Sequence, residues 1–199
     1  MKKAVVALAL FAASAGAFAQ PITEPQSNWM VRMRAVHLDS ANKDSTGQRL
    51  SINDKWLPEA DVSYFFSPNL AAELILTVPQ KHKVYAAGQR IGSFRQLPPT
   101  LTMQYHFTNL GYVKPYLGAG VNYTRLSSVN ILGNTVNVKR NAFGPALQAG
   151  FDVPLYKNLS LNVDVKKVWI RTKLRSDGNE LGTFKVDPLL VGVGLGYRF

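Results

Sequence analysis

The clearest pattern along the chain is an alternation of apolar residues with polar or small ones, repeating every two positions. Between residues 101 and 107 one phase carries large apolar side chains, and the other carries threonine, glutamine and histidine. Residues 115–123 and 189–199 repeat the pattern, often with glycine in the second phase. Because successive side chains of a strand point to opposite faces of a sheet, the pattern predicts strands whose two faces meet different surroundings.

Five further segments alternate less regularly, which gives eight predicted strands in all. Their lengths are close to the roughly 9 to 11 residues that a tilted strand needs to cross a membrane. The predicted strands cover residues 28–38, 58–66, 70–77, 101–107, 115–123, 142–153, 159–170 and 189–199.

The connections between the predicted strands alternate in length. Residues 67–69, 108–113 and 154–158 are short turns, whereas 39–57, 78–97, 126–141 and 171–185 are long. Turns at one end and loops at the other are typical of an outer-membrane barrel whose turns and termini face the periplasm. Aromatic residues near the turns and termini fit the interfacial girdle of such a barrel: Trp29, Phe66, Phe107, Tyr112, Phe151, Tyr156 and Phe199. We therefore predict an all-β, eight-stranded antiparallel transmembrane barrel with short periplasmic turns and long extracellular loops.

A secreted β-sandwich or soluble barrel would show the same alternation with its apolar face turned inward. Two features argue against it. A sandwich has no reason to separate short and long connections by end. The glycines also lie on the phase that a sandwich would turn to water, whereas small inward residues relieve crowding inside a narrow barrel.

The first residues read as a secretory signal. Lys2 and Lys3 precede an apolar run, and Ala17 to Ala19 give a small-x-small cleavage pattern. We predict a signal peptide over 1–19, a periplasmic segment over 20–27 and the barrel over 28–199. The chain has 23 basic and 12 acidic residues and no cysteine. Export argues against nucleic acid as the partner of this charge, and the lack of cysteine excludes disulfides and thiolate-bound metals.

Three segments carry a resemblance to a known family. They are residues 97–107, which read LPPTLTMQYHF, residues 114–124, which read KPYLGAGVNYT, and the terminal GYRF. On these segments the chain resembles the OmpW family of small outer-membrane barrels over nearly the whole mature sequence. The resemblance implies a porin-like protein that passes small, mostly hydrophobic molecules and serves as a bacteriocin receptor. We expect the barrel to be a monomer. Tyr197 and the final Phe199 resemble the assembly signal that the barrel assembly machinery recognises.

Eight strands enclose a space that side chains nearly fill, which argues against a wide aqueous pore. The inward phase carries charges of both signs. One interpretation is a packed polar plug that fixes the strand register, because an unpaired buried charge is costly. The other is the floor of a binding or conducting tunnel. The charged positions are Arg32, Arg34, Glu59, Asp61, Glu73, Asp164, Lys166 and Arg198.

Apolar residues on the inward phase are informative, because a polar interior has no need of them. Val168 and Ile170 follow Lys166, while Met30 and Val36 lie on the first strand. A mouth lined by such groups would accept an apolar solute. A β-bulge near residues 166–167 would instead turn Val168 and Ile170 toward lipid. A lumen-facing Lys166 also counts against a fully dry tunnel.

Lateral exit of a solute through the wall needs a weak strand pairing, and proline removes a backbone donor. Gly144 and Pro145 lie near a long loop, and we predict a local defect there through which a solute enters the lipid. The alternative is that Pro145 simply ends regular pairing.

The long loops hold most of the excess positive charge. The loop over 78–97 contains Lys81, Lys83, Arg90 and Arg95 and no acidic residue, a composition suited to the phosphates of lipopolysaccharide. A closed structural barrel that uses such loops for lipopolysaccharide, host or bacteriocin contact is the alternative function.

Enzymatic chemistry is not expected. His106 is the one histidine on the inward face of a regular predicted strand, near the periplasmic end, and we interpret it as a packed lumen residue that belongs with the transport candidates. No metal-ligand spacing appears, so neither a metal nor another cofactor is predicted.

Overall fold

The computed structural model describes residues 27–199 except for 42, 45–48, 132–136, 139–140 and 177–178. The predicted signal peptide and residues 20–26 lie outside the described residues. No helix in the described part of the chain is long and apolar enough to cross a membrane.

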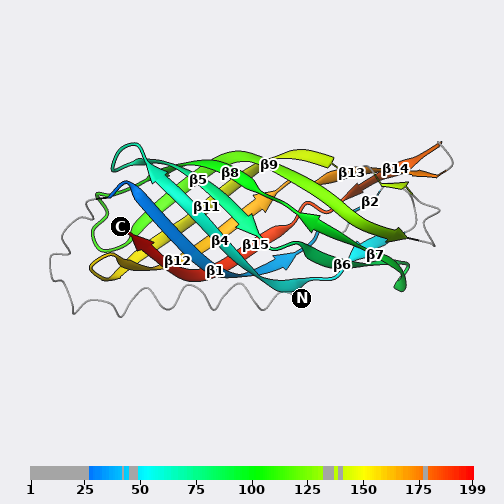
Figure 1. Cartoon of the computed structure of the whole chain (residues 1–199), viewed down its shortest axis with the longest axis horizontal. Coiled ribbons are helices and arrows are strands. Elements are labelled where there is room, and N and C mark those ends of the chain that lie inside the picture. Colours follow the sequence, from blue (N-terminus) through cyan, green and yellow to red (C-terminus); the bar gives the residue numbers. More distant parts are fainter. Residues whose placement is uncertain (1–26, 42, 45–48, 132–136, 139–140, 177–178) are drawn as a thin grey trace.

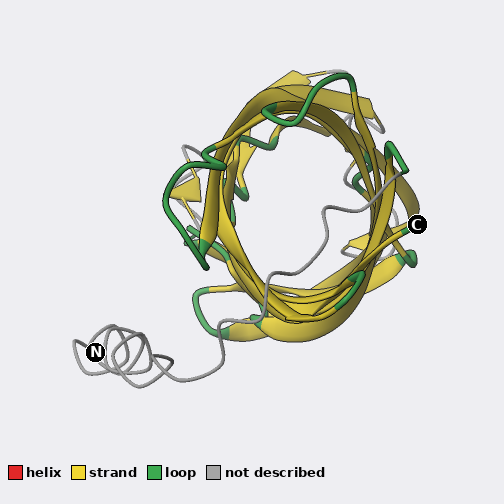
Figure 2. Ribbon diagram, turned by 90° about the vertical axis from the view of Figure 1, so that its left-hand side faces the viewer, coloured by secondary structure: helices red, strands yellow, loops and turns green. Residues whose placement is uncertain are grey.

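Eight antiparallel strands close into a barrel (Figures 1 and 2), as the sequence predicts. Each of these eight strands pairs with the next of the eight along the chain, and the last of them, β15, pairs with β1. The ring is continuous through β9 and β11, which pair from Asn141↔Arg125 to Asp152↔Lys114. The barrel strands are β1 (Trp29–Asp39), β4 (Lys55–Phe65), β5 (Leu70–Thr77), β8 (Thr100–His106), β9 (Lys114–Ile131), β11 (Asn141–Tyr156), β12 (Leu159–Val168) and β15 (Leu189–Arg198).

The two faces of the wall differ as the alternation predicts. On β8, Leu101 and Met103 point outward with 51% and 47% of their surface exposed, whereas the side chains between them are buried. Valine, leucine and aromatic side chains remain exposed around the barrel, on the surface that hydrocarbon covers in a membrane. Rings near the turns make edge-to-face pairs, including Trp29 with Tyr64 and Tyr105 with Phe107. The apolar face therefore points outward, which excludes the sandwich.

The short turns and the C-terminus lie at one end of the barrel, at the left of Figure 1. Here Ser27 donates its backbone N–H to the Phe199 carbonyl, and Asn69 Nδ2 donates to the His106 carbonyl. We call this the periplasmic end and the opposite end the outer mouth.

The long connections contain strands of their own, which the alternation of the membrane strands does not predict. They extend the wall beyond the outer mouth. β7, β6 and β3 continue the barrel sheet from β9, and β10-β13-β14-β2 form a separate four-stranded sheet. On β6 the alternation continues: Lys81 and Lys83 point outward, and His82 and Val84 are buried. Because this part of the wall stands in water, its outward phase is charged and lacks the apolar signature of a membrane strand. The added strands are β2 (Lys43–Asp44), β3 (Leu50–Ile52), β6 (Gln80–Ala86), β7 (Gln89–Leu97), β10 (Asn137–Val138), β13 (Arg171–Ser176) and β14 (Asn179–Lys185).

Candidate functional site in the barrel interior

Two arginines of β1 form the centre of a polar network inside the barrel. Arg32 Nη2 lies 2.8 Å from Asp152 Oδ2 on β11, and Arg32 Nη1 donates to Ser63 Oγ at 3.0 Å. Arg34 Nη2 pairs with Glu73 Oε1 at 2.6 Å and also with Asp61. Both arginine side chains are fully buried. Alternation alone brings these groups to one face, and the closure of the ring brings Asp152 to Arg32.

Lys166 on β12 joins the same network. Its ammonium pairs with Glu59 at 2.5 Å and with Asp164 at 3.1 Å, and Asp164 lies 3.3 Å from Arg34. The lysine is therefore paired and does not present a free charge to the lumen. Removing one partner of such a buried pair would leave a costly uncompensated charge. We refer to these charged groups as the polar network: Arg32, Arg34, Glu59, Asp61, Glu73, Asp152, Asp164 and Lys166.

Amides and a phenol connect the charges of the polar network. Gln104 donates to Glu73 at 2.7 Å, and Gln148 donates to both Asp164 and Glu73 at 2.7 and 2.9 Å. The Tyr116 hydroxyl donates to Asp164 at 2.8 Å. The predicted site residues did not include Gln104, Gln148, Asn162 or Asp152, although their inward phase was readable from the alternation. Only the closed barrel shows which of them meet.

An apolar layer lies above the polar network, toward the outer mouth. Val36, Val168 and Ile170 belong to it and are almost fully buried, as the inward phase predicts. The predicted alternative of a bulge at residues 166–167 is wrong, because the β12 register runs unbroken from Asp152↔Asn162 to Ala146↔Val168. We define the apolar layer as Val36, Leu38, Ile52, Leu57, Val84, Phe94, Leu126, Ala142, Ala146, Val168, Ile170, Val186 and Leu190.

Met30 does not line this mouth. It packs with Phe65 and Ala71 at the periplasmic end, six residues before Val36 on the same strand. Residues on one face of a strand share a phase along its whole length, so alternation does not say at which end of the barrel an inward residue lies. The interpretation of Met30 as part of an apolar mouth is therefore corrected.

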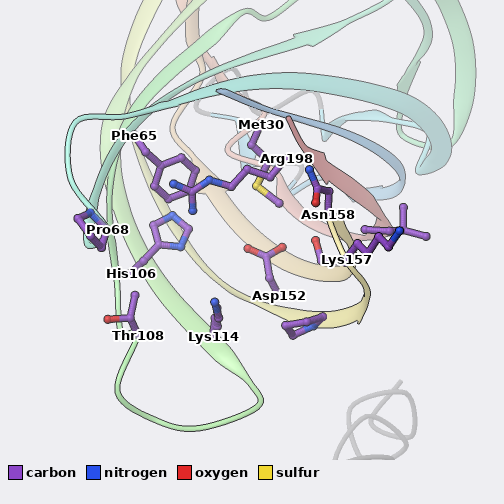
Figure 3. Close-up of a pocket in the computed structure, with 13 residues that line it drawn as sticks. Met30, Phe65, Pro68, His106, Thr108, Lys114, Asp152, Lys157, Asn158 and Arg198 are labelled. Atoms are coloured by element: carbon purple, nitrogen blue, oxygen red, sulfur yellow. The ribbon is translucent and has the colours of Figure 1, made fainter. Parts of the chain in front are cut away.

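A pocket of about 70 Å³ opens at the periplasmic end (Figure 3). The Arg198 guanidinium lies 3.9 Å above the Phe65 ring and its Nε donates to the Ser27 carbonyl at 3.0 Å. His106 stacks between Phe65 and Tyr116, with Nε2 3.0 Å from Gln104 Oε1. His106 is thus packed and hydrogen-bonded, and Arg198 lies at the rim, outside the polar network.

The regular pairing of β11 with β12 ends next to Pro145. On the β9 side, β11 is paired without interruption past Pro145. On the β12 side the regular ladder ends at Ala146↔Val168, and beyond it the Trp169 N–H donates to the Pro145 carbonyl at 3.1 Å. The Trp169 carbonyl also lies where a Gly144 Cβ would stand. We call this end of the β11–β12 ladder the seam.

The basic residues of the loop over 78–97 divide into two groups. Lys81 and Arg95 are direct partners across β6 and β7, and both are exposed on the outward face beside Lys83. Arg125 on β9 continues this face, because its neighbour Leu97 follows Arg95 on β7. Arg90 instead lies by the hairpin tip, opposite Tyr85. Arg125 was not predicted as part of this face, because in the sequence it lies at the end of a strand and not in the loop.

Tyr197 and Phe199, the predicted assembly signal, are exposed to the outside and contact each other edge to face at 5.2 Å. Their recognition by the assembly machinery stays a prediction. Among the described residues, no three histidines or carboxylates are placed to hold a metal ion.

These features define a closed eight-stranded outer-membrane barrel with a charged, internally paired lumen and an apolar outer mouth. The chain belongs to the OmpW family, whose model matches residues 28–199. It is 41% identical over 184 residues to the outer-membrane protein y4mB of Sinorhizobium fredii, over 87% of this chain and 80% of that protein. It is 29% identical over 200 residues to the dibenzothiophene metabolism operon protein PahQ of Pseudomonas aeruginosa, over 91% of this chain and 93% of that protein.

Among solved structures, the outer membrane protein OprG from Pseudomonas aeruginosa has a similar fold. The TM-score is 0.71 at 23% identity, over 88% of this chain and 97% of OprG. The predicted family resemblance is thereby confirmed. The protein resides in the outer membrane of a Gram-negative bacterium, as predicted.

Proposed function

We propose that this protein gives small apolar molecules passive entry through the outer mouth and releases them sideways into the membrane at the seam. The observation that carries the proposal is the apolar layer, which lies directly above the polar network. A purely structural barrel plugged by ion pairs has no need of buried valine, leucine and phenylalanine at its mouth. An apolar solute gains about 25 cal/mol for each Å² that it removes from water against such a surface.

The polar network directs the solute away from the periplasm. Crossing it would require an apolar molecule to separate paired charges such as Lys166–Glu59 and Arg32–Asp152 in a place that water hardly reaches. The seam lies beside Ala146 and Val168, which are members of both the apolar layer and the last regular pair of β11 and β12. Release through the seam therefore avoids the charges. The name of the relative PahQ refers to dibenzothiophene metabolism, and dibenzothiophene is an apolar aromatic compound.

A disulfide across the seam tests this route. The chain has no cysteine of its own, so Pro145→Cys with Trp169→Cys adds a single pair. Directly opposed residues of antiparallel strands have Cα atoms about 4.5 to 5.5 Å apart, within the range that a disulfide spans. The readout is the entry of the dye N-phenyl-1-naphthylamine into lipopolysaccharide-containing proteoliposomes, relative to empty vesicles.

Oxidation is expected to stop dye entry through the seam variant, and reduction is expected to restore it. Val163→Cys with Val193→Cys, a paired position on the β12–β15 wall, is the matched control and should conduct in both states. A wild-type protein that only matches empty vesicles would exclude passage altogether. Equal dye entry through the oxidised and reduced seam variants would exclude the seam as the exit.

A second candidate function is contact with lipopolysaccharide through the exposed basic face of Lys81, Lys83, Arg95 and Arg125. This face lies on β6, β7 and β9, above the lipid-facing band and beside the aromatic pair Tyr123–Phe143. Phosphate groups accept charge-assisted hydrogen bonds from such side chains. Changing all four to Gln should lower the lipopolysaccharide that co-purifies with the protein, whereas changing the periplasmic Lys114 and Lys157 to Gln should not. Unchanged co-purification would contradict this function.

A further inference from the structure

A small cavity lies between the polar network and the apolar layer. Its volume is about 30 Å³, close to the space that one water molecule or one hydroxyl group occupies. Leu38, Ile75, Val168 and Ile170 form its apolar sides, and the Glu59–Lys166 pair lies at its base. The cavity therefore lies where the apolar layer meets the polar network.

Two polar atoms at this cavity have no hydrogen-bond partner among the described residues: Gln96 Oε1 and Thr77 Oγ1. Gln96 lies on the inward face of β7 and is only 2% exposed. Other polar groups of the cavity are satisfied, since Asn122 Nδ2 donates to Thr100 Oγ1 at 2.8 Å and Thr100 Oγ1 donates to the Pro98 carbonyl at 3.3 Å. A buried polar atom without a partner lowers stability, so such atoms call for an explanation.

We propose that Gln96 and Thr77 recognise the hydroxyl group of the transported solute, so that the preferred class is an apolar alcohol or phenol. This inference rests on the proposed function and adds the substrate class to it. A hydroxyl group both donates and accepts, which matches an amide oxygen and a threonine hydroxyl at once. The cavity has room for that one group, and the apolar body of the solute lies against the apolar layer above it. Gln96 is a specificity-determining residue in this arrangement.

The test compares 2-naphthol with naphthalene, which differ only in the hydroxyl group. Their binding to the full-length mature protein in nanodiscs is followed by probe fluorescence, with empty nanodiscs as the reference. The wild-type protein should bind 2-naphthol about 5 to 30 times more tightly than naphthalene, the effect of one or two hydrogen bonds. Gln96→Leu should reduce this preference several-fold and leave naphthalene binding unchanged or stronger.

The matched control is Gln80→Leu. Gln80 is the direct partner of Gln96 on β6, is also buried, and has its Nε2 bonded to the Val78 carbonyl, but it does not line the cavity. This variant should keep the wild-type preference. Stability gives an independent readout: because Gln96 Oε1 has no partner, Gln96→Leu should raise the urea midpoint of unfolding, whereas Gln80→Leu should lower it.

The outcomes separate the two proposals. If neither probe binds beyond the empty nanodiscs, the proposed passage of apolar molecules fails and this inference fails with it. If both probes bind equally to the wild-type protein, passage stands, water alone occupies the cavity and the inference is overturned. A preference for 2-naphthol that survives both Gln96→Leu and Thr77→Val also overturns it.

Discussion

The Trp169 backbone N–H donates to the Pro145 carbonyl at 3.1 Å, and Pro145 has no N–H with which to return the bond. The two residues of a hydrogen-bonded pair in an antiparallel ladder normally exchange two such bonds. The β11–β12 ladder therefore ends with one hydrogen bond in place of two, at the level of the apolar layer. Under the proposed function, this weakened pairing is where a solute leaves the apolar layer and enters the membrane.

Restoring the missing donor should strengthen the seam. We expect Pro145→Val to slow entry of N-phenyl-1-naphthylamine several-fold and to raise the free energy of unfolding by about 1 kcal/mol, the typical net contribution of one hydrogen bond. The matched control is Pro115→Val on β9, whose carbonyl accepts from the Phe107 N–H at the periplasmic end. The control should leave dye entry unchanged. Faster entry through Pro145→Val would contradict the role of the seam.

The polar network should respond strongly to the loss of one cation. Arg32→Met removes the partner of Asp152 and leaves that buried carboxylate uncompensated. We expect the free energy of unfolding in urea to fall by about 3 to 5 kcal/mol. Arg198→Met at the half-buried rim should cost clearly less. Equal losses for the two variants would show that the interior pairing does not stabilise the barrel more than a rim contact does.

Gly150 leaves room for Tyr116, which donates a hydrogen bond to Asp164 of the polar network. Gly150 on β11 is paired with Tyr116 on β9, and a Cβ at Gly150 would meet the Tyr116 ring and hydroxyl. Gly150→Val should therefore displace Tyr116, break its hydrogen bond to Asp164 and destabilise the barrel by about 1 to 3 kcal/mol. Ala149→Val, one position along and exposed to lipid, should be nearly neutral. If Gly150→Val leaves the stability of the barrel unchanged, Tyr116 can take another position without loss of stability, and the prediction is contradicted.

The extension above the membrane should be sensitive to acid through His82. Burial beside Phe94, followed by the charge of Lys55, lowers the pKa of His82 from 6.5 to about 4, against a smaller opposing effect of the Asn53 backbone. Between these two pH values the unfolded chain binds a proton that the folded chain does not. The contribution of neutral His82 to the free energy of unfolding is therefore fully present above pH 6.5. The free energy of unfolding falls by about 3 kcal/mol as the pH drops to 4.

The measurement is the urea midpoint at pH 7 and pH 4.5 for the wild-type protein and for His82→Phe, which keeps the ring packing against Phe94. The variant should lose a smaller part of its stability on acidification, because the remaining loss comes from the carboxylates alone. An identical pH dependence in the two proteins would refute a neutral buried His82.

The sequence determined the membrane part of the fold. The alternation at residues such as Leu101 and Met103 specifies strands, and its apolar phase specifies an outward face toward lipid, because hydrocarbon and lumen place opposite demands on successive side chains. The lengths of the connections then specify which end faces the periplasm. The strands of the extension were not predictable in this way, since water surrounds them and their outward phase carries charges such as Lys81 and Arg95.

The tertiary structure decided which inward residues meet. Periodicity assigns Arg32, Asp152 and Lys166 to the lumen, but pairing across a barrel depends on its closure and on the stagger of strands far apart in the chain. Pairing between strands likewise placed Arg125 beside Arg95 and left Gln96 Oε1 without a partner among the described residues at the cavity. Met30 and Val36 are separated by their positions along one strand, which a period of two does not report. Alternation is a property of each strand by itself, whereas contacts between strands arise only when the strands pair and the ring closes.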